Sequence, residues 1–250
     1  MPTLLLEMPV AGQNSVNHAS YQRYVAEYDK DDRLMNSEVY LLAAYPEIVR
    51  GKRLLDLGVG TGRTAHVLPH LAQEYVATDY SPAMVEAFRQ RFASLTCYHD
   101  DARAMQFADA SFDTVVFSFN GLDSVDHAAR LKILSEVRRV LVPGGYFLFS
   151  SHNREQAYTW TPKRFPRNPW RWWAALQDRR RTAANQARNR SLERQTPEYA
   201  IVNDPSHEYS MVLYYITAEA QRRQLEQAGF TLIESVRMEQ YWNGYLAQKV

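Results

Sequence analysis

Cysteine is almost missing from this sequence, since Cys97 is the only one in 250 residues. A single thiol excludes an intrachain disulfide and a metal site built from several cysteines. The seven histidines show no spacing typical of metal ligands. We therefore expect no metal, and we interpret Cys97 as a buried strand residue.

Long hydrophobic runs are absent as well. The longest, TVVFSF and YFLFSS, fall far below the ~20 residues that a helix needs to cross a bilayer. The N-terminal MPTLLLEMPV is too short and too acidic for a secretory signal peptide. We therefore expect a soluble, cytoplasmic protein with no membrane partner, while its oligomeric state stays open.

The chain also lacks an excess of one charge, because 29 basic residues stand against 28 acidic ones. The balance is uneven along the chain, however. Between Lys163 and Arg194 there are ten basic and two acidic residues, a local net charge of +8. Such a segment is either the solvated face of a helix or a surface that binds phosphates.

Strand-like and helix-like segments alternate between residues 52 and 151. Apolar runs predict five strands, at residues 52–58, 75–80, 95–102, 112–119 and 146–151. The alternation is typical of an open parallel sheet with helices on both faces. Ligands of such sheets bind at the carboxyl ends of the strands.

This regular alternation stops after residue 152 and resumes at residue 217. Residues 153–216 hold the basic segment and the strand-like SMVLYYIT, but no clear strand and helix repeat. We interpret residues 153–216 as an inserted helical and β-stranded substrate cap. Residues 51–152 and 217–250 then form the core, and residues 1–50 form an N-terminal helical lid.

A glycine-rich turn follows the first predicted strand in RLLDLGVGTGRTAHVL, with Gly58, Gly60 and Gly62 at alternate positions. Glycines at this place let backbone amides approach a ligand, which is a general property of cofactor sites. The G-x-G-x-x-G pattern of dinucleotide sites is not met in either register. The pattern that begins at Asp56 is D-x-G-x-G-x-G.

Three further motifs follow this turn in order. They are an acidic residue, Asp79, in VATDYS, the pair Asp101 and Ala102 after the third strand, and LSEVRRVLVPGGYFLF. With these four motifs the chain resembles the class I S-adenosylmethionine-dependent methyltransferases, closely over residues 52–151 and loosely over the last thirty residues. The resemblance implies an α/β fold, the Rossmann-like methyltransferase fold, with an open seven-stranded, mostly parallel sheet. It also implies S-adenosyl-L-methionine as the methyl donor.

The resemblance assigns the nucleoside contacts to the ends of the second and third strands. Asp79 is expected to accept hydrogen bonds from the ribose hydroxyls. Asp101 is expected to accept one from the adenine amino group, with Asp100 as the alternative, and Ala102 offers its backbone amide. The remaining cofactor contacts that the resemblance implies are Tyr28, Asp56, Gly58, Gly60, Gly62, Arg63, Tyr80, Met84, Ser118, Phe119 and Asn120.

The methionine end of the cofactor is expected beside FSFNGLDSVD. Ser118 and Asn120 would bind the amino acid part, and the ring of Phe119 suits a sulfonium cation. Tyr28, on a predicted N-terminal helix, and Arg63 are both candidates for the methionine carboxylate.

Methyl transfer from a sulfonium chiefly requires that the acceptor be aligned and that water be excluded. A base is needed only where the acceptor is protonated. His152, directly after the fifth strand, and His207, in the cap, are the candidate bases, and Asn153 is placed to orient a carbonyl or hydroxyl.

The cap is rich in aromatic residues, which predicts an apolar pocket for a planar acceptor. Substrate contacts are expected from Tyr21, Trp160, Trp173 and Tyr209. The sequence FNGL stands where base-modifying relatives carry [DNS]PP[YFW], which disfavours amines of nucleic acid bases. We predict transfer to oxygen or nitrogen of a small aromatic or heteroaromatic compound of secondary metabolism.

Three alternatives stay open. An RNA or protein methyltransferase would use the basic segment of the cap. A Rossmann oxidoreductase would bind NAD(P), although the last glycine of the G-x-G-x-x-G pattern is missing from the turn. A domain of this fold without catalysis would bind another ligand.

Overall fold

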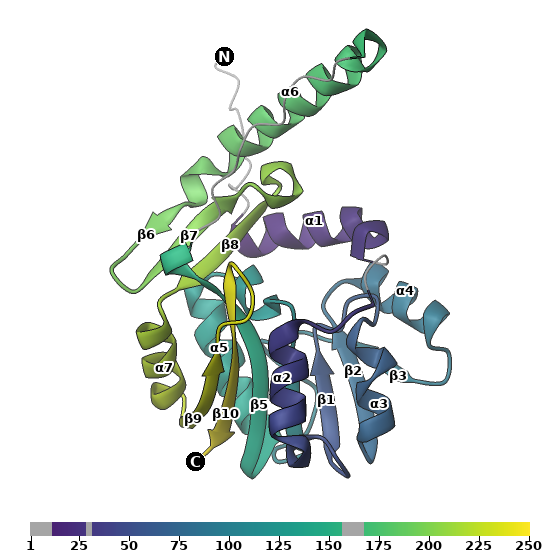
Figure 1. Ribbon diagram of the computed structural model, residues 1–250, viewed down its shortest axis with the longest axis vertical. Helices are drawn as coiled ribbons and strands as arrows, with labels where there is room; N and C mark the ends of the chain where they lie inside the picture. Colours follow the sequence, from purple (N-terminus) through teal and green to yellow (C-terminus); the bar gives the residue numbers. More distant parts are fainter. Residues whose placement is uncertain (1–11, 29–31, 157–167) are drawn as a thin grey trace, which may run out of the picture.

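The computed structural model describes residues 12–28, 32–156 and 168–250, and only the backbone at positions 27, 28, 156, 169, 206 and 207. A ten-stranded sheet lies at its centre (Figure 1). The strands are β1 (Arg53–Leu57), β2 (Glu74–Asp79), β3 (Thr96–His99), β4 (Phe112–Phe117), β5 (Leu141–Asn153), β6 (Arg194–Gln195), β7 (Tyr199–Asp204), β8 (Met211–Ile216), β9 (Phe230–Val236) and β10 (Trp242–Lys249).

Seven of these strands form the core that the sequence predicts. The order runs β3-β2-β1-β4-β5, with all four pairings parallel, and continues through antiparallel β10 to β9. The other three strands, β6 to β8, extend the sheet from the carboxyl end of β5. There β8 pairs with β5 only at two positions, His152 with Tyr215 and Asn153 with Ile216. The fold class is therefore confirmed, with three strands more than predicted.

Helices cover both faces of the sheet, except that the first and the sixth lie beyond the carboxyl ends of the strands (Figure 1). They are α1 (Gln13–Tyr28), α2 (Asn36–Ala44), α3 (Leu68–Leu71), α4 (Pro82–Arg91), α5 (His127–Val140), α6 (Trp172–Asn189) and α7 (Ala218–Gln227). Short 3₁₀ turns that matter for the site are η2 (Thr64–His66), η3 (Gly121–Ser124), η5 (Pro169–Arg171) and η7 (Ser206–Tyr209). Within the described residues, every helix is too short or too polar to cross a bilayer.

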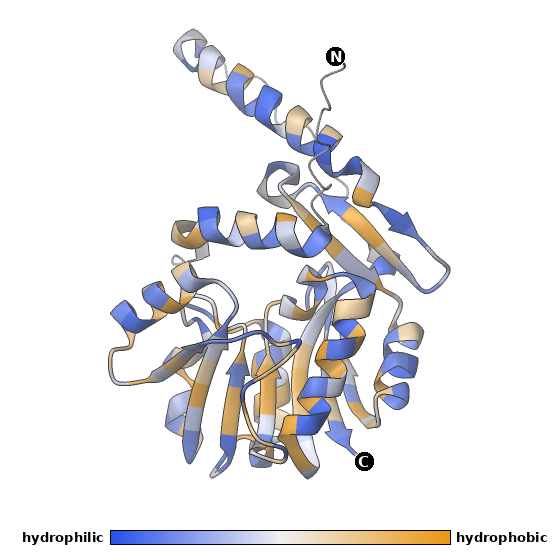
Figure 2. Cartoon of the chain, turned by 180° about the vertical axis from the view of Figure 1, so that it is seen from behind, coloured by the Kyte–Doolittle hydropathy of each residue, from blue (hydrophilic) through white to orange (hydrophobic). Residues whose placement is uncertain are grey.

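Alternate residues of the central strands point to opposite faces, as the period of a β-strand requires. On one face Leu55 and Val115 pack with α5 and α7. On the other face Leu54 and Val116 pack with α2 and α3. The apolar strands, orange in Figure 2, are thus buried on both sides, as parallel strands generally are.

The segment after the glycine turn differs from its prediction. The pattern TGRTAHVLPHLAQE predicts one helix, but the chain forms η2 and then the single turn of α3. Pro69 occupies the first turn of α3, where its missing N–H is tolerated. A helix continuous from residue 61 would need that N–H as a donor, so the proline divides it.

The buried guanidinium of Arg130 joins α5 to η3, β5 and α7. Its side chain, with no exposed surface, donates hydrogen bonds to Asp123 on η3 and Ser151 on β5. It also donates to Gln221 and Gln224 on α7. One cation therefore holds together the elements that surround the carboxyl end of β5.

We predict that Arg130→Met lowers the free energy of unfolding by about 3–5 kcal/mol, because it leaves the buried Asp123 carboxylate without its cation. Urea denaturation measures this change. The control is Arg223→Met, whose half-exposed side chain pairs with Glu219 and Glu198 and contributes less than about 1 kcal/mol. Equal effects of the two substitutions would contradict the role given to Arg130.

Candidate functional site

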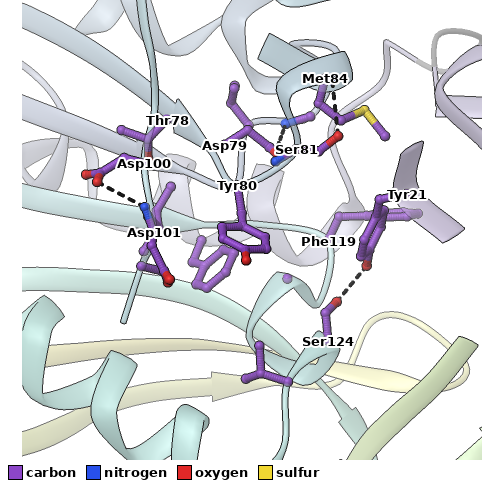
Figure 3. Close-up of a pocket in the computed structure, with 18 of the residues that line it drawn as sticks. Tyr21, Thr78, Asp79, Tyr80, Ser81, Met84, Asp100, Asp101, Phe119 and Ser124 are labelled. Atoms are coloured by element: carbon purple, nitrogen blue, oxygen red, sulfur yellow. Dashed lines mark hydrogen bonds between the residues drawn. The ribbon is translucent and has the colours of Figure 1, made fainter. Parts of the chain in front are cut away.

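A pocket of about 380 Å³ lies at the carboxyl ends of β1, β2 and β4, beside the loop that follows β3 (Figure 3). Helix α1 contributes part of its wall, with Asn17, His18 and Tyr21. The volume falls in the range of about 300–1,000 Å³ that small-molecule sites occupy. The pocket is therefore where the fold class predicts a ligand.

The carboxylate of Asp79 ties two loops of this pocket together. One oxygen accepts the backbone N–H of Gly60 at 2.9 Å, and the other accepts the N–H of Ser81 at 2.8 Å. Gly60 has a φ of +60°, and a Cβ there would meet no atom within 4 Å, so its Cα faces open space. Burial raises the pKa of Asp79, while these two amides oppose the rise.

Two carboxylates with different hydrogen-bond partners lie at the carboxyl end of β3. Asp101 is held by Arg103, whose guanidinium donates to both oxygens at 2.7–3.1 Å and keeps the Asp101 pKa low. Asp100 is 6% exposed and accepts the backbone N–H groups of Asp101 and Gln106. Burial raises its pKa. Both residues and Ala102 line the pocket, and the Asp100 carboxylate forms no ion pair with a described residue.

Apolar and aromatic groups flank these acids. Met84, 2% exposed, and Tyr80, 45% exposed, both line the pocket. The Tyr80 ring lies edge-on to His18 at 4.8 Å, and the Arg103 guanidinium lies 5.3 Å from its centre. These contacts form a slot bounded by a ring and a thioether beside the carboxylates.

Arg63 lines the pocket, but it already has an acidic partner. Its guanidinium donates to both carboxylate oxygens of Glu38 on α2 at 2.7 Å and to Ser118 Oγ at 3.1 Å. Glu38 is 3% exposed, so the ion pair is largely shielded from water. The predicted contact with a ligand carboxylate would therefore have to compete with Glu38.

The loop after β4 has an unusual backbone. Phe119 and Asn120 both adopt positive φ, +50° and +59°, which is rare for residues with a Cβ. The N–H of Asn120 donates to Ser150 Oγ at 2.8 Å, which fixes this conformation. The strain turns Phe119 outward, 43% exposed at the rim of the pocket, while Asn120 is buried behind it.

On the face that α1 turns toward the pocket, sequence reasoning named Tyr21 and missed Asn14, Asn17 and His18. Asn14, Asn17, His18 and Tyr21 line the pocket and follow the helical spacing i, i+3, i+4 and i+7. Asn17 Nδ2 donates to two carbonyls, and the Tyr21 hydroxyl lies 2.6 Å from Ser124 Oγ. The same periodicity, searched among polar residues and not only among aromatic ones, would have found them.

Asp56 lies beneath the glycine turn with no exposed surface. One oxygen accepts hydrogen bonds from the hydroxyls of Thr64 and Tyr75, and the other has no partner among the described residues. Burial raises the pKa of Asp56 to about 6. Asp56 therefore supports the turn and does not itself line the pocket.

His152 does not line the pocket, and Trp242 contacts both its ring and the ring of Phe119. Its Nδ1 lies 2.8 Å from the buried Asp123 carboxylate, and its Nε2 lies 3.4 Å from Asn120 Nδ2. The ring packs 6.1 Å from Trp242, which in turn lies 6.1 Å from the Phe119 ring. The imidazole is thus oriented by a carboxylate and lies next to an aromatic pair at the pocket rim.

Several predicted site residues lie elsewhere. Gly62 packs against Phe92, the residue directly after α4, since a Cβ there would lie 2.4 Å from that ring. Asn153 is buried and accepts the N–H of Glu155. Trp173 is 67% exposed on α6, and Tyr209 on η7 does not line the pocket. Trp160 lies outside the described residues, as do the side chains of Tyr28 and His207.

The residues present fit a nucleoside that carries an amino acid. Carboxylates accept hydroxyl and amino donors at one end, the turn at Gly60 leaves room for close approach, and Arg63 and Ser118 supply polar groups at the other end. Thr78 Oγ1, in the pocket wall, is buried and has no partner among the described residues. Such an orphaned group is typical of a site that a ligand completes.

Residues 54–145 match the family model described as a methyltransferase domain. A demethylmenaquinone methyltransferase of Clavibacter sepedonicus is 36% identical over 135 residues, which are 51% of this chain and 54% of that protein. The chain thus spans about half the length of this curated relative.

Solved structures share the fold. A Burkholderia thailandensis 1,6-didemethyltoxoflavin-N1-methyltransferase, with bound 1,6-didemethyltoxoflavin and S-adenosylhomocysteine, has a TM-score of 0.65 at 15% identity. The match covers 98% of this chain and 93% of that one. A glycopeptide N-methyltransferase complexed with S-adenosyl-L-methionine has a TM-score of 0.59 at 23% identity, over 86% and 93% of the two chains.

These comparisons confirm the predicted family and fold. The chain carries a methyltransferase domain of the class I S-adenosylmethionine-dependent type, and S-adenosylmethionine is the cofactor of that class. The matched segment contains the glycine turn, Asp79, both acids after β3 and the loop after β4. It ends before His152 and the cap.

The raised pKa of Asp56 predicts a pH dependence of stability. Between the unfolded pKa near 3.8 and the folded value of about 6, the folded state keeps the proton that the unfolded state loses. Stability is therefore lost as the pH rises through this window. We expect Asp56→Asn to gain about 2–3 kcal/mol relative to the wild type between pH 4 and pH 7, measured by urea denaturation. A constant difference across this range would contradict the buried, proton-retaining carboxyl.

Asp79 is expected to carry much of the affinity for the nucleoside. We predict that Asp79→Ala weakens S-adenosylhomocysteine binding about 10²–10⁴-fold, because two charge-assisted hydrogen bonds are lost. Titration calorimetry measures the dissociation constant, and circular dichroism verifies folding. Asp113→Ala is the control, since Asp113 pairs with Arg53 at the opposite end of the sheet. Unchanged affinity in Asp79→Ala would show that the ribose lies elsewhere.

Proposed function

Because residues 54–145 are a methyltransferase domain, we propose that this chain transfers a methyl group from S-adenosylmethionine to oxygen or nitrogen of a small, planar aromatic or heteroaromatic metabolite. We assign this reaction to secondary metabolism. The proposal includes the division into a lid (1–50), a core (51–152 and 217–250) and a cap (153–216).

The observation that carries the proposal is the aromatic rim beside the cofactor pocket. Phe119 is held outward by its positive φ, and the Trp242 ring lies edge-on to it, with 6.1 Å between the ring centroids and an interplanar angle of 65°. Tyr21 closes the wall on the side of α1. Aromatic faces bind planar rings through stacking and edge contacts, and a rim of this kind gives such a ring a fixed orientation.

The names of two similar proteins support a small-molecule acceptor. One is a demethylmenaquinone methyltransferase, and the other was solved with bound 1,6-didemethyltoxoflavin. The second shares only the fold with this chain at 15% identity, so its bound compound indicates a class of acceptor and not the acceptor itself.

We assign the cofactor to the pocket as follows. Asp79 accepts from the ribose hydroxyls, and Tyr80 and Met84 enclose the adenine ring. Asp100 replaces Asp101 as the acceptor of the adenine amino group, because Arg103 occupies the Asp101 carboxylate. When bound, S-adenosylmethionine supplies an electrophilic methyl group next to a sulfonium.

We assign the general base to His152. Asp123 accepts from Nδ1, which leaves Nε2 as the acceptor nitrogen on the side of Asn120. Arg130 balances the charge of Asp123 at the other carboxylate oxygen. Asp123 and Arg130 are therefore positioning residues, and His152 would take a proton from a phenol or an amide-like nitrogen as the methyl group is transferred.

The alternatives have less support. The RNA or protein acceptor rests on the basic segment, but no described residue of α6 lines the pocket. The NAD(P) alternative requires a pyrophosphate at the glycine turn and a glycine at the last position of the G-x-G-x-x-G pattern, which the turn lacks.

A screen tests the proposed function. Purified protein, radiolabelled S-adenosylmethionine and a panel of phenolic and nitrogen-heterocyclic compounds should give labelled product with at least one panel member. Transfer only to RNA or protein would contradict the small-molecule assignment. Tight binding of NAD in place of S-adenosylhomocysteine would contradict the methyltransferase activity.

The role of His152 has its own test. We expect His152→Ala to lower kcat about 10²–10⁴-fold on the product-forming compound, with S-adenosylhomocysteine affinity unchanged. Added imidazole should restore part of the rate, which a structural role would not explain. The exposed His70 on α3 gives the control, His70→Ala, with wild-type kcat. An unchanged kcat in His152→Ala would remove the base from the mechanism.

A further inference from the structure

Helix α6 leaves the body of the protein and projects into solvent (Figure 1). Among its residues only Asn185 and Asn189 are buried, and both lie in its second half. A helix with so little packed surface gains little stability from tertiary contacts. The large apolar side chains of its first half, Trp172, Trp173 and Leu176, are exposed.

One side of α6 faces the body through polar contacts. Asn185 Nδ2 and Asn189 Nδ2 donate to the carbonyls of Glu208 and Tyr209 on η7, at 3.0 and 2.9 Å. Arg181 donates to the Glu208 carboxylate at 2.7 Å. These three residues share one helical face, which fixes the rotation of the helix about its axis.

The opposite face combines apolar and basic residues. At about 100° per residue, an arc of about 120° directly across from that face holds Ala183 and Ala187 in the second half of the helix, and in the first half Trp172, Trp173, Leu176, Arg179 and Arg180. We call the five residues of the first half the α6 face. Its three apolar side chains are 51%, 67% and 37% exposed, respectively. Trp170, just before the helix, is 92% exposed.

We propose, against the sequence-based expectation of no membrane partner, that the α6 face docks on an anionic lipid surface. Tryptophan prefers the boundary between headgroups and acyl chains, and arginine keeps its charge at the headgroups while its stem covers apolar surface. Residues 168–190 contain six arginines and one acidic residue, a net charge of +5. A negatively charged leaflet attracts such a segment, and the apolar end then inserts.

Two other partners fit this face less well. A second copy of the chain would bring two helices of the same positive charge together. A single-stranded nucleic acid is usually held in a basic groove that tracks its backbone, whereas the α6 face is the convex side of a lone helix. The inference does not depend on the proposed methyl transfer, because no residue of α6 lines the described pocket.

Vesicle flotation with the full chain tests the proposal. We expect the protein to float with vesicles of 30% phosphatidylglycerol in phosphatidylcholine, and not with pure phosphatidylcholine. Binding should weaken as salt is added, and tryptophan fluorescence should shift to shorter wavelength. The same result with both vesicle types, or no flotation with either, overturns the proposal.

Two sets of variants locate the contact. Reversing both charges, Arg179→Glu with Arg180→Glu, should weaken vesicle binding at least tenfold and leave S-adenosylhomocysteine affinity unchanged. Trp172→Ser with Leu176→Ser should abolish the fluorescence shift on vesicles. The matched control reverses Arg222 and Arg223 on the exposed face of α7 and should retain wild-type vesicle binding.

The other partners give distinguishable results. Sedimentation velocity that shows a dimer dispersed by Trp172→Ser with Leu176→Ser would assign the face to a second copy. Tighter binding of the wild type to single-stranded RNA than to anionic vesicles would assign it to nucleic acid. Either outcome overturns the lipid proposal and leaves the methyl transfer assay unaffected.

Discussion

The two hydrogen bonds that Asp79 accepts determine the shape of the pocket. They join the turn after β1, through Gly60, to the start of α4, through Ser81. Both bonds run from backbone amides to a partly buried carboxylate, so the turn cannot relax without leaving that carboxylate short of hydrogen bonds. The open side of the Gly60 turn and the acids after β3 then face one cavity. Figure 3 shows the carboxylates of this cavity beside Tyr80 and Met84.

A second buried charge organises the opposite side of the site. Arg130 holds Asp123, and Asp123 fixes the imidazole of His152. The cofactor side is therefore built from local loops at strand ends, whereas the side proposed for the acceptor depends on contacts between η3, β5 and α7. The family match, residues 54–145, includes the first side together with Asp123 and Arg130, and it ends before His152 and α7.

The sequence predicts the elements and motifs that depend on neighbouring residues, and it misses contacts between residues far apart in the chain. Gly60 and Asp79 follow directly from a motif, because a strand, a turn and a helix place them whatever surrounds them. The partner of Arg63 was not predictable, since Glu38 belongs to a helix 25 residues earlier that reaches the pocket only through tertiary packing. The extension of the sheet was missed for a similar reason, as β8 pairs with β5 at only two positions. Trp173 is an aromatic residue of the kind that lines pockets. The direction of α6, however, is set by polar contacts to η7, and the spacing of residues in the sequence does not predict these contacts.

The central claim is that a nucleoside lies across the ends of β1, β2 and β3 with its sugar on Asp79. A crystal structure of the protein grown with S-adenosylhomocysteine tests it most directly. The account predicts both ribose hydroxyl oxygens within about 3.2 Å of the Asp79 carboxylate, with the adenine between Tyr80 and Met84. A ligand bound elsewhere, or an Asp79 side chain turned away from the sugar, would contradict it.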